Sequence, residues 1–162
     1  MRRKLLAALI ACVAFALAAS GAAAKANFAG TWVLDVAKSE GIWPGTEQTL
    51  TVSQTDDRIE LELKAKTPQG ERTSKDAYTA DGREVEFAPP GTTGKGKRTV
   101  KWSADGAMEI SELYDAPTPE GTDTMKSWRR WSLSADGRML FVEQRAQAPN
   151  GLSLTKRVFI KQ

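Results

Sequence analysis

The side chains that could do chemistry in this chain are carboxylates, arginines and aromatic rings. The chain contains no histidine and a single cysteine, Cys12. Zinc centres and most haem centres take histidine or cysteine ligands, and serine or cysteine nucleophiles commonly depend on a histidine base. A catalytic triad is therefore excluded, and we expect no metal, no cofactor and no enzymatic activity.

One alternating run could place a polar spot inside an apolar pocket. Met108, Ile110, Glu112 and Tyr114 occupy every second position and so share one face of a strand. An inward Glu112 beside Tyr114 is typical of small-molecule pockets, although the same pattern fits a strand that emerges into solvent. We take these four as candidate ligand-binding residues. Acid–base catalysis would need a second carboxylate at a defined separation, which the sequence does not establish.

A second run alternates tryptophan with arginine at residues 128–131. If Trp131 points inward with Leu133, Arg129 is drawn into the interior, where a lone charge is costly without a partner. Glu112, Glu143 or a ligand carboxylate could be that partner. The alternative is an outward arginine packed beside a tryptophan. Arg129 and Trp131 join the candidate site.

Trp43 is the third aromatic candidate. It lies in the loop Ile42-Trp43-Pro44-Gly45, between the first two predicted strands. A large ring in such a loop either packs over the rim of the fold or covers a ligand. We add Trp43 to the candidate ligand-binding residues.

The elements that must position these side chains are short strands. Alternation with period two recurs about ten times and no helical period is sustained. Three near copies of one turn, ending in Asp81-Gly82, Asp105-Gly106 and Asp136-Gly137, separate several of the runs. One face of most runs is apolar, so the sheet must curl to bury it. We predict an all-β fold, a single antiparallel up-and-down β-barrel of about 8–10 strands. A two-sheet β-sandwich is the alternative.

The first 24 residues have the pattern of a Sec-type secretory signal peptide. Arg2, Arg3 and Lys4 precede an apolar run that ends in small residues, and cleavage is expected after Ala24. The run is too short for an integral membrane span. A lipoprotein site at Cys12 is the less favoured alternative. We expect residues 1–24 to be removed and residues 25–162 to form one periplasmic or secreted domain.

Removal of the leader changes the charge balance. The chain has 23 Lys and Arg against 20 Asp and Glu, so loss of the three leader cations leaves twenty of each. A near-neutral domain does not favour nucleic acid or an anionic membrane as the default partner.

The segment Phe28-Ala29-Gly30-Thr31-Trp32-Val33-Leu34-Asp35 resembles the opening motif of lipocalins and their calycin relatives. Its continuation to Ser39, with residues 133–137, is similar to uncharacterised bacterial exported lipocalin-like proteins. The resemblance implies that Gly30 and Trp32 form a structural barrel plug and that Arg157, on the last strand, stacks over Trp32. The 12 residues from Ala37 to Gln48 are too few for the helical lid pair of fatty-acid-binding relatives.

These observations predict an exported β-barrel that holds a small, mainly hydrophobic ligand in its interior. The alternative is an envelope protein-interaction or inhibitor module with a solid barrel, whose loops bind a protein of the envelope.

Overall fold

A computed structural model describes residues 23–89, 94–119, 121–149 and 151–162. Antiparallel strands make up most of these residues, and a single turn of 3₁₀ helix, η1 (Val36–Lys38), follows the first strand. The strands in chain order are β1 (Gly30–Leu34), β2 (Glu47–Thr55), β3 (Arg58–Thr67), β4 (Gly70–Thr79), β5 (Glu84–Phe87), β6 (Gly96–Trp102), β7 (Met108–Thr118), β8 (Gly121–Leu133), β9 (Met139–Ala148) and β10 (Gly151–Lys161).

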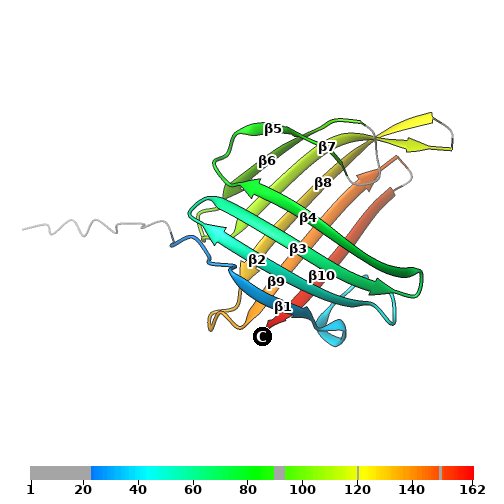
Figure 1. The fold of residues 1–162 in the computed structure, drawn as a ribbon. Helices are drawn as coiled ribbons and strands as arrows, with labels where there is room; N and C mark the ends of the chain where they lie inside the picture. The colour runs from blue at the N-terminus through cyan, green and yellow to red at the C-terminus, as the bar shows by residue number, and fades with distance from the viewer. Residues whose placement is uncertain (1–22, 90–93, 120, 150) are drawn as a thin grey trace, which may run out of the picture.

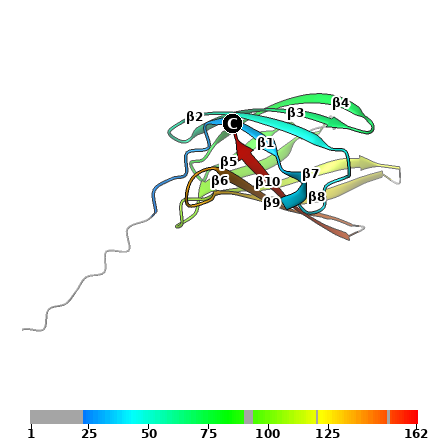
Figure 2. The same cartoon turned by 90° about the horizontal axis from the view of Figure 1, so that it is seen from below.

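The strands form one continuous sheet in the order β4-β3-β2-β1-β10-β9-β8-β7-β6-β5. The first and last strands pair with each other, with Trp32 opposite Lys161, so that β4 and β5 become the two edges. The sheet curls over itself, and β1–β4 lie as one layer across the layer of β6–β10 (Figures 1 and 2). The prediction of an up-and-down β-barrel is confirmed, since a sandwich would consist of two separate sheets.

Asp-Gly turns connect two of the hairpins as predicted. Gly106 and Gly137 have φ of 80° and 68°, which glycine adopts without a steric penalty. In each of these turns a serine hydroxyl donates to the aspartate two residues later, at 2.6 Å. The third copy is different, because Gly82 lies between the two edge strands and donates its N–H to Val100 in β6. The prediction of a hairpin at that turn is wrong.

Two further connections are those between β7 and β8 and between β1 and β2. Ala116–Thr118 do not form a loop, because they continue β7 and pair with the start of β8. The long β7–β8 hairpin therefore projects from the body of the barrel (Figure 1). The connection from β1 to β2 contains only η1, so the expectation that it has no room for a pair of helices is confirmed.

Aromatic rings close one end of the barrel, which we call the floor. Trp32 is fully buried, and its indole N–H donates to the Phe28 carbonyl at 2.8 Å. Phe28 stacks on Trp102 and meets Trp131 edge-on. The plug role of Trp32 agrees with this arrangement. The cation over the Trp32 ring, however, is Lys161, with Nζ at 5.2 Å from the ring centroid, and not Arg157.

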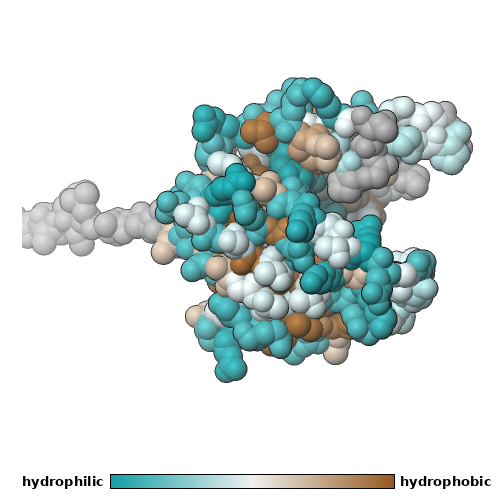
Figure 3. Space-filling view, in the orientation of Figure 1, coloured by the Kyte–Doolittle hydropathy of each residue, from teal (hydrophilic) through white to brown (hydrophobic). Residues whose placement is uncertain are grey.

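The face of the molecule seen in Figure 3 is mainly hydrophilic, with hydrophobic side chains showing between the polar ones. The part of the chain that the structure describes contains no helix with the length and apolarity that a membrane span requires. All but the last two residues of the predicted signal peptide, Cys12 included, lie outside the described residues.

Candidate functional site

A cavity of about 380 Å³ lies between the two layers of the sheet, on the inner side of the strands. Apolar side chains from four strands line one part of its wall: Leu50, Leu61, Leu63, Val142 and Phe159. Its volume falls within the range of about 300–1,000 Å³ that is usual for small-molecule sites. The barrel therefore has room for a small molecule between its layers, which favours the interior-ligand prediction over the solid-barrel alternative.

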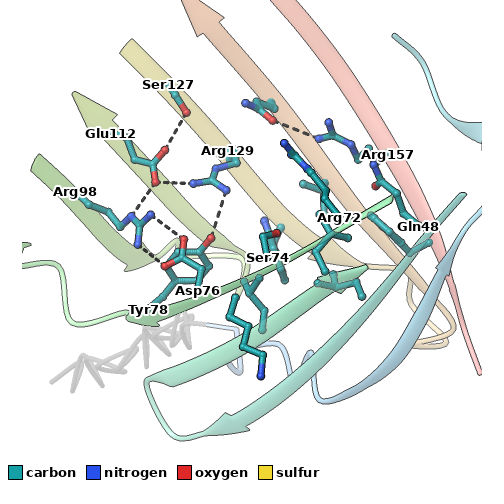
Figure 4. Close-up of a pocket in the computed structure, with 18 of the residues that line it drawn as sticks. Gln48, Arg72, Ser74, Asp76, Tyr78, Arg98, Glu112, Ser127, Arg129 and Arg157 are labelled. Atoms are coloured by element: carbon teal, nitrogen blue, oxygen red, sulfur yellow. Dashed lines mark hydrogen bonds and ion pairs between the residues drawn. The ribbon is translucent and has the colours of Figure 1, made fainter. Parts of the chain in front are cut away.

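At one side of the cavity, Arg98 joins β6 to the edge strand β4. Its two terminal nitrogens donate to the two carboxylate oxygens of Asp76 at 2.9 and 2.8 Å, and its Nε donates to Glu112 at 2.8 Å. Its guanidinium carbon lies 4.2 Å from the ring centroid of Phe87 and 4.8 Å from that of Tyr78. Such stacked and bidentate contacts suit the planar guanidinium and not a lysine. Arg98 thus links the two edges of the sheet, because it binds Asp76 on β4 and packs against Phe87 on β5 (Figure 4).

Burial alone would lower the pKa of Arg98, which is only 6% exposed. The hydrogen bonds and charge of Asp76, together with the charge of Glu112, outweigh this effect and raise the pKa above its usual range. Arg98 is therefore a charge whose cost of burial is offset by two carboxylates within the protein itself.

Glu112 is the shared acceptor of this network. Besides Arg98 it accepts hydrogen bonds from Arg129 Nη2 at 2.5 Å and from the Ser127 hydroxyl at 3.3 Å. Arg129 therefore points inward, and Glu112 is its partner among the candidates proposed from the sequence. The second Arg129 terminal nitrogen donates to the Tyr78 hydroxyl at 3.3 Å. Burial raises the pKa of Tyr78 to about 12, so this phenol is neutral at physiological pH.

Arg157 has no such carboxylate. Its Nη1 donates to the Gln144 side-chain oxygen at 3.3 Å, and no Asp or Glu among the described residues forms an ion pair with it. Burial lowers the pKa of Arg157, and the positive charges of Arg129 and Arg72 lower it further. This end of the cavity, which also holds Gln48 and Arg72 (Figure 4), is electrostatically positive.

Unsatisfied polar atoms concentrate on the same cavity. In the described part of the chain, five side-chain polar atoms are buried without a hydrogen-bond partner, and four of them belong to cavity-lining residues. Three of those four are N–H donors: Nε of Arg129, Nε of Arg157 and Nε1 of Trp131. Buried donors normally have acceptors. These three nitrogens are themselves inaccessible, so they add to the positive character of the wall and are not shown to open into the cavity.

The formal charges on the cavity wall also give it a positive character. Four arginines line it (Arg72, Arg98, Arg129 and Arg157) against two carboxylates, Asp76 and Glu112. Lys75 also lies on the wall, but it forms an ion pair with Glu62 and is largely exposed. Arg98 and Arg129 bind the two carboxylates, which leaves the Arg157 end with an excess of positive charge. An anionic group is the chemical complement of this arrangement.

The residues predicted from the sequence to bind a ligand divide into those that line the cavity and those that lie elsewhere. Glu112, Tyr114, Arg129 and Trp131 line the cavity. Arg157 also lines the cavity, and is not part of the plug in which it was placed.

Three of the predicted ligand-binding residues lie elsewhere. Met108 and Ile110 are fully buried in the core, because the face that they share with Glu112 continues down to the floor. Trp43 is 73% exposed and does not line the cavity, whereas its neighbour Ile42 packs against the core. These three predictions are corrected.

Sequence reasoning missed Arg98, Asp76 and Tyr78. A signal existed for Arg98, which shares its strand face with Val100 and Trp102, but not for Asp76, whose face also carries Arg72 and Ser74. A charge on an otherwise apolar face indicates a buried ion pair. The pairing itself could not be foreseen, because β4 and β6 meet only where the two edges of the curled sheet approach each other.

Comparisons with known proteins support the fold. No protein-family model and no curated protein matches the sequence. Among solved structures, the chain is similar to one named REP1-NXSQ fatty acid transporter, with a TM-score of 0.56 and 15% identity over 83% of this chain and 95% of that one.

It is also similar to zebrafish ileal bile acid-binding protein complexed with cholic acid. That match has a TM-score of 0.56 and 18% identity, and it covers 83% of this chain and 98% of the other. A Schistosoma mansoni fatty acid-binding protein in complex with arachidonic acid gives a TM-score of 0.51 and 12% identity, over 83% and 96% of the two chains. At these identities the likeness shows the β-barrel fold alone, which agrees with the fold that the resemblance implied.

Proposed function

We propose that this protein binds one small amphiphile inside the barrel, with the hydrophobic body of the ligand against the apolar wall and an anionic group at Arg157. The observation behind the proposal is the positively charged end of the cavity, where Arg157 forms no ion pair with a carboxylate of the described residues. A carboxylate offers two acceptor oxygens and pairs well with a guanidinium. The similar structures, which are named for fatty acids or bile acid, support a ligand of this class.

Binding without catalysis is the form of activity that we propose. Each of the two carboxylates in the cavity wall is held by arginine, Asp76 by one and Glu112 by two. Since both accept charge-assisted hydrogen bonds, neither is positioned to exchange protons with a ligand. The proposed role is therefore to hold or carry the amphiphile.

A competition experiment tests the proposal. A fluorescent lipophilic probe bound to residues 25–162 should be displaced by hexadecanoic acid and much less readily by hexadecan-1-ol, which has the same chain length but no charge. Equal displacement by the acid and the alcohol would show that Arg157 takes no part in recognition. Failure to bind any lipophilic probe would refute the proposal as a whole.

We also propose that the protein is exported before it binds its ligand. The leader pattern of residues 1–24 supports this, and the near-neutral domain that follows contains no cysteine. Mass spectrometry of the protein from secreting cells should give a chain that begins at Lys25. A full-length chain retained in the cytoplasm would contradict export and leave the binding proposal intact.

A further inference from the structure

Exposed leucines gather on the outer face of β7–β10, away from the cavity. Leu152 and Leu154 are 63% and 60% exposed, and Leu113 is 42% exposed. Their neighbours Glu112, Tyr114, Arg129 and Arg157 line the cavity, so alternation along the strands places these leucines on the opposite face.

The strand register sets these leucines in two adjacent rows across four strands. One row runs Leu113, Lys126, Gln147, Leu152, and the next runs Ser111, Trp128, Arg145, Leu154. Four strands span about 14 Å from first to last at the usual spacing of about 4.8 Å. We call Leu113, Lys126, Trp128, Arg145, Leu152 and Leu154 the outer patch.

The charges of the outer patch have one sign. Arg145 lies over the Trp128 ring, with its guanidinium carbon 5.4 Å from the ring centroid. Within the described residues, neither Arg145 nor Lys126 forms an ion pair, and the two rows contain no carboxylate. The rows on both sides carry carboxylates: Asp115 lies beyond Leu113, and Glu109 and Glu143 flank Arg130 in the row beyond Ser111.

We infer that the outer patch docks the protein reversibly on an anionic lipid surface. Leucines beside a tryptophan can enter the boundary between headgroups and acyl chains, and unneutralised cations are attracted to anionic headgroups. Protein–protein interfaces, by contrast, are depleted in lysine and bury about 800 Å² on each partner, more than two rows of side chains provide. The patch lies on the same strands that carry Arg129 and Arg157 on their inner face, so docking would bring the cavity close to a source of amphiphiles.

Vesicle flotation with residues 25–162 tests this inference. The protein should float with vesicles of phosphatidylcholine and phosphatidylglycerol, and about 25-fold less with phosphatidylcholine alone, taking about fivefold for each of two cations. Added salt should weaken binding to the anionic vesicles.

Two double variants separate the contributions. Leu152→Ser with Leu154→Ser should reduce flotation at least about tenfold, since most of the apolar area that enters the lipid is lost. Lys126→Gln with Arg145→Gln should remove the preference for phosphatidylglycerol. Matched controls away from the patch are Val36→Ser with Val85→Ser, and Lys64→Gln with Lys66→Gln; both should float like the parent protein. Circular dichroism confirms that each variant is folded.

Arg157→Met distinguishes docking from entry of lipid into the cavity, because it should leave flotation unchanged. Equal binding to neutral and anionic vesicles, or flotation that survives both patch variants, would overturn the inference. A dimer in sedimentation experiments that disappears in the leucine variant would assign the patch to a second copy of the chain instead.

Discussion

Replacing Arg157 with methionine should stabilise the ligand-free protein and weaken its binding of anionic amphiphiles. The Nε of Arg157 is buried without an acceptor, and burial and neighbouring cations lower the pKa of its guanidinium. Methionine retains an unbranched apolar stem and removes both the unsatisfied donor and the charge.

The expected stabilisation is about 1 kcal/mol. An unsatisfied buried donor costs about 1–3 kcal/mol, and the loss of the hydrogen bond to Gln144 at 3.3 Å offsets part of that gain. For a domain of this size the melting temperature should rise by about 3–5 °C.

The expected loss of binding is larger. A charge-assisted hydrogen bond to a carboxylate contributes about 1.5–3 kcal/mol, which corresponds to about 10- to 100-fold in the dissociation constant of hexadecanoic acid. Hexadecan-1-ol should bind the variant and the parent equally, since it makes no ion pair. Arg138→Met is the matched control, because Arg138 is exposed in the β8–β9 turn.

Isothermal titration calorimetry and thermal melting measure the two effects on the same samples. A variant that melts lower than the parent, and binds the acid as tightly, would refute the reasoning. It would show that Arg157 is a structural residue whose charge is satisfied within the protein.

Three further predictions concern the Arg98 network and the floor. Arg98→Met should lower the free energy of unfolding by about 3 kcal/mol in urea denaturation, and adding Asp76→Leu should recover much of it, because the second change removes a carboxylate left without its partner. Tyr78→Phe should abolish a loss of stability of at most about 2.7 kcal/mol between pH 10 and pH 12. The pKa of Tyr78 in the folded protein is about 12, above the usual value of 10.0, so the unfolded chain loses the phenol proton first. The contribution of Tyr78 to stability is therefore complete below pH 10 and disappears as the pH rises. Denaturation curves of the parent and variant across that range measure the difference, and parallel curves would contradict it. Trp32→Ala should cost about 3–5 kcal/mol because the ring is fully buried in the floor, and a loss below about 1 kcal/mol would show that the floor does not depend on it.

Much of the fold followed from local pattern. The recurring period-two alternation predicted the strands, and the Asp-Gly pairs at 105–106 and 136–137 lie in two hairpins that the structure contains. The turn at Asp81-Gly82 has the same local sequence but joins strands that do not pair. The difference is set by where the curled sheet ends, which no local signal records.

The candidate site was predictable only in part, for the same reason. The inward face of Glu112 and Tyr114 followed from alternation, as did the inward Arg129 once Trp131 was taken as core. Alternation does not say how deep a residue lies, so Met108 and Ile110 were placed in the pocket although they belong to the floor. Arg98 and Asp76 lie on strands that meet only across the two edges of the sheet, and their contact is a property of the whole fold.

A crystal structure of residues 25–162 with hexadecanoic acid tests the central claim most directly. The ligand carboxylate should lie about 2.7–2.9 Å from the guanidinium of Arg157, with its chain against Leu50, Leu61 and Phe159. A carboxylate in solvent, a chain outside the barrel, or an unchanged cavity with no ligand at saturating concentration would contradict the account.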